Sequence, residues 1–296
     1  MIGTAATTSP ASTSRLARGS RGARRFLGAS QLNVLGAALV LLVVLAALLG
    51  EALAPYPPNQ MALVERLAPP SAVHLFGTDD FGRDLFSRVL AGARISLEVA
   101  AVVLSIAVVL GTLLGAVSGL AGGLVDEVIM RVTDLFLAFP ALILAAAIAA
   151  TFGGNLVTTV VALSTVYWPW YARLVRGQIL SLRERDFVLA ATVAGARAPR
   201  IIRRHLLPNV LPLIIVYVSL DIGYVILSTS ALSFLGLGAQ PPTPEWGAMM
   251  TDARSYLRDA WWFPTFPGLA IAVTVLGFNL LGDGLRDFFD PHLRGR

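Results

Sequence analysis

Long uncharged stretches alternate with short polar ones along this chain. Residues 26–50, 99–125 and 135–172 contain no charged side chain. A helix needs about 20 apolar residues to cross a hydrocarbon core roughly 30 Å thick, so each stretch is long enough to span a membrane. The third stretch is 38 residues long and contains the turn-forming sequence TFGGN at 151–155, which favours two spans in a hairpin over one very long helix.

The pattern therefore predicts an all-α membrane protein. Two further apolar stretches follow, and Asp221 interrupts the first of them. We expect six transmembrane helices, at about 31–53, 97–121, 135–152, 155–172, 209–236 and 262–284. A basic loop, 173–208, separates the fourth from the fifth. Residues 1–30 form a basic tail without periodicity, which predicts disorder, and the membrane domain then covers 31–296.

The first apolar stretch has a second interpretation, as a secretory signal peptide. Basic residues precede it, and ALA at 52–54 resembles a cleavage site. However, the apolar run exceeds the usual 7–15 residues of a signal peptide, and Pro55 would directly follow the cut. These two features favour a retained first transmembrane helix.

The distribution of arginine predicts the orientation. With six spans both termini lie on one side, together with the connection after the second span and the loop 173–208. That side carries 17 arginines and the other side carries 6. Because basic residues are enriched on the cytoplasmic side of membrane proteins, we expect both termini and the basic loop to be cytoplasmic.

Composition excludes several kinds of chemistry. The chain has a mean hydropathy of +0.72 and no cysteine, which excludes disulfides and thiolate sites. All 23 basic residues are arginine, so a phosphate-binding loop with its obligatory lysine is excluded. The three histidines, at 74, 205 and 292, are far apart in sequence and indicate no catalytic triad. We predict no catalytic, cofactor-binding or metal-ligating residue, no nucleic acid partner, and the lipid bilayer as the surroundings.

The basic loop has a pattern of its own between Asp186 and Pro208. Asp186 is a candidate N-cap for a short helix, and Pro199 suits the first turn of a second helix that Pro208 would end. Small side chains on the first helix make a narrow surface, and a glycine follows that permits a helix stop or a close backbone approach; these are Ala190, Ala191, Ala194 and Gly195. A loop that only fixes topology needs charge but not this spacing, so a docking element is the favoured interpretation.

The same spacing resembles the cytoplasmic EAA loop of bacterial ABC importer permeases. Ala190 and Ala191 are followed by three residues, Gly195, nine residues and then the run from His205 to Pro208. Leu189 stands where that family has glutamate, and His205 stands where it has isoleucine. Three other segments look like the C-type permease of dipeptide and oligopeptide importers, so that the resemblance covers roughly 31–296: GTDDFGRDLFSRVLAGARISL (77–97), ALSFLGLGAQPPTPEWG (231–247) and FNLLGDGLRDFFDPHLR (278–294).

The resemblance implies a type I ABC importer permease fold in the bacterial inner membrane, with cytoplasmic coupling helices. A second homologous permease subunit would complete the pore, two ABC ATPase subunits would bind ATP and Mg, and an extracytoplasmic binding protein would deliver a dipeptide or oligopeptide. The chain itself would not be an enzyme. The residues expected to couple to the ATPases are Ala190, Ala191, Ala194, Gly195, Arg200, Arg203, His205, Leu207 and Pro208.

Three polar residues are candidates for the translocation path. Asp221 lies within a span, where a carboxylate costs about 2.5–3.5 kcal/mol on insertion scales unless it is paired, solvated or protonated. It contacts cargo on one interpretation. On the other, an arginine or a polar neighbour holds it inside the bundle without cargo contact. The resembling family often has an acidic residue where Thr229 stands, and Asn279 lies near the end of the last span.

Two further motifs have structural interpretations. Gly111, Gly115 and Gly119 form a small-residue face on the second span, which favours close packing within the subunit over an interface between subunits. The carboxylates of GTDDFGRD do not match the spacing of a calcium-binding loop. Asx-turns and helix caps formed by Asp79 and Asp84 are the favoured interpretation, with Arg83 and Arg88 near the outer leaflet.

Two other functions stay open at this point. An ion-coupled secondary carrier would use Asp221 as its ion or proton site, and an importer of the same class could carry nickel or another non-peptide cargo. A membrane scaffold without transport leaves Asp221 unexplained.

Overall fold

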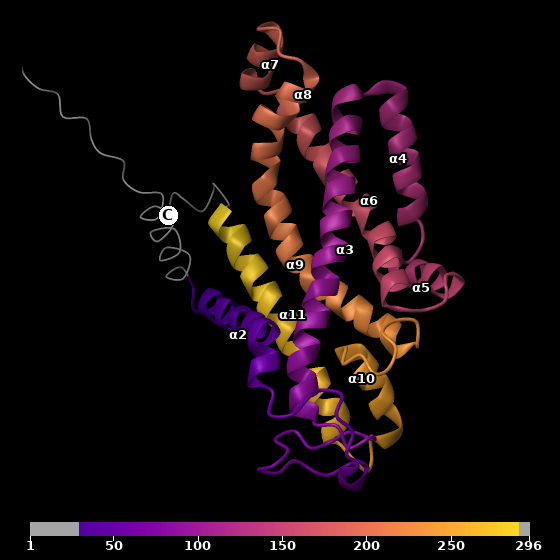
Figure 1. Cartoon of the computed structure of the whole chain (residues 1–296). Coiled ribbons are helices and arrows are strands. Elements are labelled where there is room, and N and C mark those ends of the chain that lie inside the picture. The colour runs from indigo at the N-terminus through magenta and orange to yellow at the C-terminus, as the bar shows by residue number, and fades with distance from the viewer. Residues whose placement is uncertain (1–29, 290–296) are drawn as a thin grey trace, which may run out of the picture.

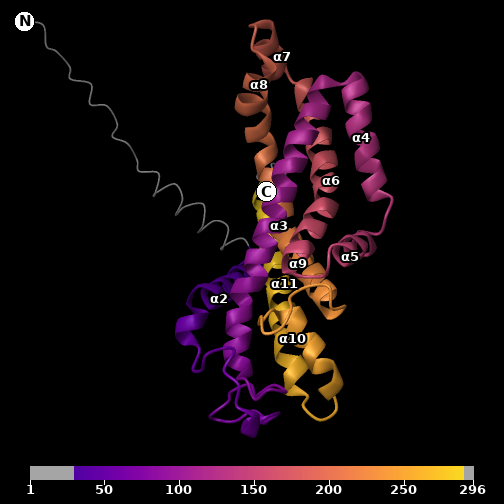
Figure 2. The same ribbon diagram turned by 45° about the vertical axis from the view of Figure 1, so that its right-hand side comes forward.

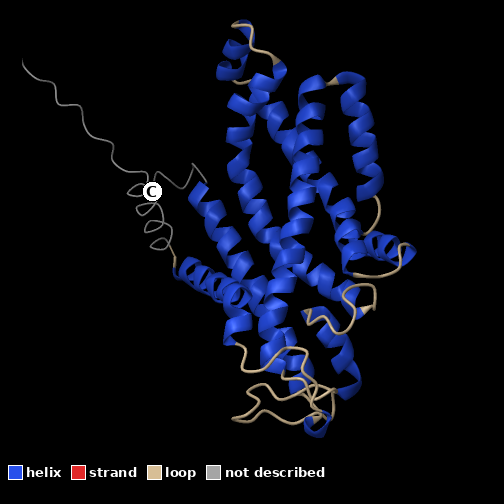
Figure 3. Ribbon diagram, viewed as in Figure 1, coloured by secondary structure: helices blue, strands red, loops and turns tan. Residues whose placement is uncertain are grey.

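The computed structural model describes residues 30–289 and shows a long helical bundle (Figures 1 and 3). The expected tail, 1–30, lies outside this range except for Ser30. Within 30–289 the structure contains one isolated β-bridge, between Thr78 and Asp84, and is otherwise helix and loop. The elements are α2 Gln31–Leu53, the 3₁₀ helix η1 Leu63–Glu65, α3 Leu85–Ala121, α4 Gly123–Leu137, α5 Ala141–Thr151, α6 Leu156–Arg183, α7 Asp186–Val193, α8 Ala198–Ile201, the π-helical turn η2 Ile202–Leu206, α9 Leu207–Phe234, α10 Trp246–Ala253, the 3₁₀ helix η3 Arg254–Tyr256 and α11 Trp262–Phe289.

Four helices are long and apolar enough to cross a membrane. These are α2, α3, the continuous helix 198–234 and α11, and the bent pair of α4 and α5 would make a fifth span. The molecule is therefore an all-helical membrane protein with four or five candidate spans. The count of six spans stays a prediction, because α6 does not meet the same criterion of length and apolar composition among the described helices. The orientation in the membrane also stays a prediction.

The expected span over 135–152 is not one helix. Pro140 separates α4 from α5, and the two helix axes meet at 87°. Proline has no backbone N–H to donate and disfavours the helical conformation in the residue before it, which explains the break. The apolar run alone did not predict this bend because proline is uncharged.

Two other boundaries differ from the expected ones. The helix α3 begins at Leu85 rather than near 97, because Asp84 caps it by accepting the Ser87 N–H. Its 37 residues make it about 56 Å long, longer than the hydrocarbon core. Likewise, α6 continues past 172 to Arg183, so the basic loop begins inside a helix. Both helices extend to the α7 end of the bundle (Figure 1).

The second helix of the basic loop does not end at Pro208. It passes through η2 into α9, and Pro208 and Pro212 lie inside the continuous helix. In η2 the Leu207 N–H donates to the Ile202 carbonyl, five residues back, and Pro208, which has no N–H to donate, directly follows this π-helical turn. Asp186 is the first helical residue of α7, and Arg185 takes the N-cap position that was expected for Asp186.

The core around α3 combines alanines with larger apolar residues. The helix α3 packs against α2, α6 and α9 and runs through the middle of the bundle (Figure 2). Ala107, Ala162 and Ala172 are completely buried there, which lets these helices approach closely. A smaller cluster, which includes Val175, Val188 and Leu206, holds α7 and η2 on the ends of α6 and α9.

Candidate functional site

The segment from Asp186 to Pro208, called the docking element below, projects at one end of the bundle (Figure 1). Val188 is buried against the bundle, whereas Ala190 and Ala194 are exposed and Ala191 is half-buried. The small side chains expected to form a surface therefore face outward from a helix that is anchored from behind. Of the remaining expected coupling residues, Arg200, Arg203 and Pro208 are exposed, and His205 and Leu207 are half-buried.

Gly195 ends α7 with a specific turn. Its φ is +78°, in the left-handed region that L-residues other than glycine rarely adopt. The Ala196 N–H donates to the Ala191 carbonyl, and the Gly195 N–H donates to the Thr192 carbonyl, which is the hydrogen-bond pattern of a Schellman C-cap. Glycine is thus required by the backbone turn, while a Cβ at this position would meet no atom within 4 Å.

Ion pairs tie neighbouring helices together close to the docking element. Arg176 on α6 binds both carboxylate oxygens of Asp126 on α4, at 2.5 and 2.6 Å. Arg173 on α6 pairs with Asp134 on α4. Arg183 donates to the Gly119 carbonyl at the end of α3. Arginines that were expected only to mark the cytoplasmic side therefore also hold α4 and α3 to α6.

A cavity of about 530 Å³ lies between α5, α6 and α9. It is lined by Ala141, Val166, Tyr167, Trp170, Tyr171, Arg173, Leu174, Tyr217, Asp221 and Tyr224. The side chains of Trp170 and Tyr224 are 62% and 60% exposed, so the cavity opens toward the outside of this subunit. Asp221 is thus placed at a concave, aromatic-rich surface rather than sealed inside the bundle.

Hydrogen bonds orient the polar groups of the cavity. The Tyr171 hydroxyl donates to Asp221 Oδ2 at 2.6 Å, and Tyr171 itself is 1% exposed. The Tyr167 hydroxyl lies 3.2 Å from the Ser228 hydroxyl. No cationic side chain among residues 30–289 forms an ion pair with Asp221. A polar neighbour therefore holds one carboxylate oxygen of Asp221, and its contact with cargo stays a prediction.

The other two path candidates do not line this cavity. Thr229 is 2% exposed, and its hydroxyl has no hydrogen-bond partner among the described residues. Asn279 is half-buried and faces Gly223 of α9, since its Oδ1 lies 3.6 Å from where a Cβ on Gly223 would be. Only Asp221 of the three candidates is brought to the cavity.

The glycine face of α3 packs against α6. A Cβ on Gly111 would lie 2.5 Å from Tyr171 Cβ, and one on Gly115 would lie 2.4 Å from the Ala172 carbonyl oxygen. A Cβ on Gly119 would lie 2.8 Å from Ile179. These contacts are within the subunit, and the one at Gly111 also sets the position of the tyrosine that binds Asp221.

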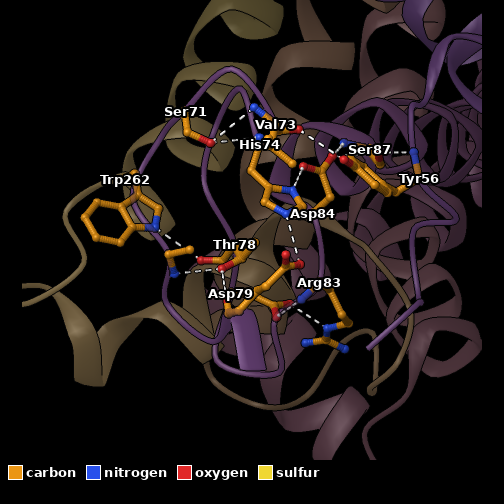
Figure 4. Close-up of polar contacts among 12 residues, drawn as sticks. Tyr56, Ser71, Val73, His74, Thr78, Asp79, Arg83, Asp84, Ser87 and Trp262 are labelled. Carbon is orange, nitrogen blue, oxygen red and sulfur yellow. Dashed lines mark hydrogen bonds and ion pairs between the residues drawn. The ribbon is translucent and has the colours of Figure 1, made fainter. Parts of the chain in front are cut away.

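The opposite end of the bundle contains a charge cluster, defined here as Asp79, Asp80, Arg83, Arg88 and Asp252. Asp79 Oδ1 accepts the N–H groups of Phe81 and Arg83 in an Asx-turn, and its Oδ2 lies 2.5 Å from Arg83 Nε (Figure 4). Arg83 and Arg88 are each 2% exposed, so both are buried, and their place near the outer leaflet stays a prediction. No group of three metal-binding side chains occurs within residues 30–289, which gives the calcium interpretation no support.

His74 was missed by the sequence interpretation. Its Nδ1 lies 2.9 Å from Asp84 Oδ1, and its Nε2 lies 3.2 Å from Glu65 Oε2 (Figure 4). Burial lowers the pKa of His74, but the hydrogen bonds to Asp84 and Glu65 and the charges of both outweigh it, so the pKa is raised overall. The imidazole joins the N-cap residue of α3 to η1. Nothing in the sequence spacing of these three residues predicts that they meet.

Comparison with known proteins gives two family matches. Residues 111–295 match the family described as "Binding-protein-dependent transport system inner membrane component". Residues 20–70 match the family described as "N-terminal TM domain of oligopeptide transport permease C". The first match covers more than half of the chain, and the second covers α2 and the start of the loop that follows it.

Several curated proteins are similar over most of their length. The chain is 47% identical over 270 residues to the probable D,D-dipeptide transport system permease protein DdpC of Escherichia coli, covering 91% of each chain. It is 49% identical over 267 residues to the dipeptide transport system permease protein DppC of the same species, covering 88% of this chain and 89% of that one. The dipeptide transport system permease protein DppC of Alkalihalophilus pseudofirmus is 46% identical over 229 residues, 77% of this chain and 75% of that one.

Proposed function

Since this chain belongs to the family of binding-protein-dependent transport system inner membrane components, we propose that it forms half of the pathway by which an ATP-driven importer moves peptides into the cell. It is a multi-pass permease component of the inner membrane and not an enzyme. This family membership argues against an ion-coupled secondary carrier. The peptide cargo is proposed because the relatives are dipeptide and D,D-dipeptide permeases.

The docking element is proposed to contact an ABC ATPase. The observation that carries this proposal is the outward-facing surface of Ala190 and Ala194 on a helix anchored by buried Val188. Small side chains let a helix enter a groove on another protein without steric cost. The chain contains no lysine with which to form a phosphate-binding loop, so ATP and Mg would be bound by the partner ATPase subunits. Leu189, which is 50% exposed, would offer an apolar contact where the EAA loop has glutamate.

The proposed assembly places the docking element and both termini in the cytoplasm and the loop 54–84 outside. In this arrangement α6 would be a sixth span beside α3, even though its polar second half lowers its apolar content. A second permease subunit would cover the open side of the cavity, and an extracytoplasmic binding protein would meet the loop end. The excess of arginine near α7 and in the two terminal segments supports this orientation.

Purification from native membranes tests the proposed function. A tagged chain, extracted in a mild detergent, should retain an ABC ATPase and a second permease subunit in comparable amounts. The complete transporter with its binding protein, reconstituted in proteoliposomes, should take up peptide only when ATP is present. Uptake without ATP that an ionophore abolishes, or purification without any ATPase, would show a secondary carrier instead. Mass spectrometry of small molecules bound to the binding protein would separate peptides from nickel and other cargo.

A further inference from the structure

The cavity between α5, α6 and α9 contains a carboxylate that forms no ion pair with the described residues. Two of its lining residues are charged, Arg173 and Asp221. Arg173 is already paired with Asp134 on α4, whereas Asp221 receives only the hydrogen bond from the neutral Tyr171 hydroxyl among the described residues. A carboxylate in a membrane-spanning segment is costly unless it is paired, solvated or protonated. A cationic ligand would remove that cost, and an anionic one would increase it.

The remaining lining also favours a cation. Four tyrosines and Trp170 surround the carboxylate. The faces of aromatic rings carry negative electrostatic potential and attract ammonium groups within about 6 Å of the ring centre. At about 530 Å³, the cavity falls in the range of sites that bind small molecules, roughly 300–1,000 Å³. It is therefore large enough to admit more than an inorganic ion.

We propose that this cavity binds the protonated amino terminus of the passing peptide, with Asp221 as its charge partner. This inference rests on the proposed function, which supplies a peptide cargo. The amino group of a peptide has an ordinary pKa of about 7.7–8.0, so most of it is an ammonium group at neutral pH. Tyr171 is a positioning residue: its hydroxyl holds one carboxylate oxygen and leaves the other available to the ligand. The site selects for a free amino terminus and is indifferent to the side chains beyond it.

Direct binding of two matched probes tests the inference without the binding protein. The probes are dialanine and N-acetyl-dialanine, which differ in the charge of the amino terminus. Saturation-transfer NMR would measure each probe on the purified permease–ATPase complex in nanodiscs. We expect a clear signal for dialanine with the parent protein. The signal should fall several-fold for N-acetyl-dialanine and by a similar factor when Asp221→Asn is given dialanine.

Control variants separate this site from general effects. Asp283→Asn removes an exposed carboxylate on α11 and should leave the dialanine signal unchanged. Asp221→Glu keeps the charge and should restore most of the signal, which shows that a loss in Asp221→Asn does not reflect misfolding. Equal signals for the two probes, equal signals for parent and Asp221→Asn, or no dialanine signal in the parent would each overturn the inference. ATP-dependent uptake by the same parent preparation shows independently whether the proposed function holds.

Discussion

Single residues determine how the loop 54–84 is held to the start of α3. The imidazole of His74 can donate to both Asp84 and Glu65 only when both of its nitrogens carry protons. A buried group of this kind links protonation to folding. The sequence did not predict these contacts of His74. The three residues are separated by loop segments, and the sequence pattern does not reveal the path of a loop.

Replacement of His74 should produce a pH-dependent loss of stability. Since the folded-state pKa of His74 is raised, its stabilising contribution is fully present below the unfolded value of about 6.5 and is lost as the pH rises through the folded value. At pH 6 we expect His74→Gln to melt about 3–5 °C below the parent protein, with a smaller difference at pH 9. Thermal unfolding in detergent measures this. A difference between His74→Gln and the parent that stays constant from pH 6 to pH 9 would contradict the prediction.

Asp79 should be far more important for stability than an exposed carboxylate. Asp79 is completely buried and faces Arg83 and Arg88, so Asp79→Asn leaves buried guanidinium groups with less negative charge. Removing one partner of a buried pair costs about 3–5 kcal/mol. The matched control is Glu98→Gln, which breaks the exposed pair with Arg94 and should cost far less stability, because solvent screens exposed pairs. Similar unfolding midpoints for the two variants in denaturant would show that the charge cluster is not a structural core.

At the scale of elements, the helices that sequence predicted well were those with uninterrupted apolar runs. The helices α2, α9 and α11 overlap the spans expected from composition because burial in lipid requires a continuous apolar surface whatever the packing. The failures were at Pro140, at η2 and at the start of α3, where the predicted cap by Asp84 is confirmed but was not joined to the span expected from about 97. Each depends on backbone hydrogen bonding rather than hydropathy: a missing donor, a shifted register and a side-chain cap.

The docking element gives a prediction about coupling. The test variant is Ala194→Trp, because Ala194 is exposed and precedes the turn at Gly195. A tryptophan at Gly195 itself would also disturb the left-handed C-cap, so its effect on coupling could not be separated from its effect on the turn. Overpacking a contact costs about 1–3 kcal/mol. We therefore expect Ala194→Trp to insert in the membrane normally and to lose substrate-stimulated ATP hydrolysis by roughly tenfold or more. Leu124→Trp, at an exposed leucine of α4 near the same end, should retain coupling. Normal hydrolysis in Ala194→Trp would remove α7 from the ATPase contact.

At the scale of the whole molecule, the structure separates two ends with different chemistry. The docking element and its arginines lie at one end, and the loop 54–84 with its buried charge cluster lies at the other (Figure 1). The segments of the charge cluster come from distant parts of the chain, since Arg83 lies 3.9 Å from Asp252. The excess of arginine near α7 can be counted in the sequence. The pair of Arg83 and Asp252 cannot be predicted in that way, because an ion pair between residues so far apart in sequence depends on the complete fold.

The two ends should be accessible from opposite sides of the membrane. Because the chain has no cysteine, single-cysteine variants can be labelled without background. Val64→Cys, at a fully exposed position of η1, should react with a membrane-impermeant maleimide in intact cells whose outer surface is accessible. Ala194→Cys should react only after the inner membrane is permeabilised. Labelling of both positions from the same side would contradict the proposed orientation, which places three spans, an odd number, between η1 and α7.

The helix 198–234 connects the docking element to the cavity without a break. Asp221 lies about 21 Å along the helix axis from Leu207, at 1.5 Å per residue. One inserted or deleted residue between Ala198 and Asp221 would turn the carboxylate by about 100° relative to α8 and move it by about 1.5 Å. The number of residues between Ala198 and Asp221 should therefore be fixed, even where the residues themselves can be replaced. A change in chain length between the docking element and Asp221 should therefore impair coupling more than a substitution in the same interval.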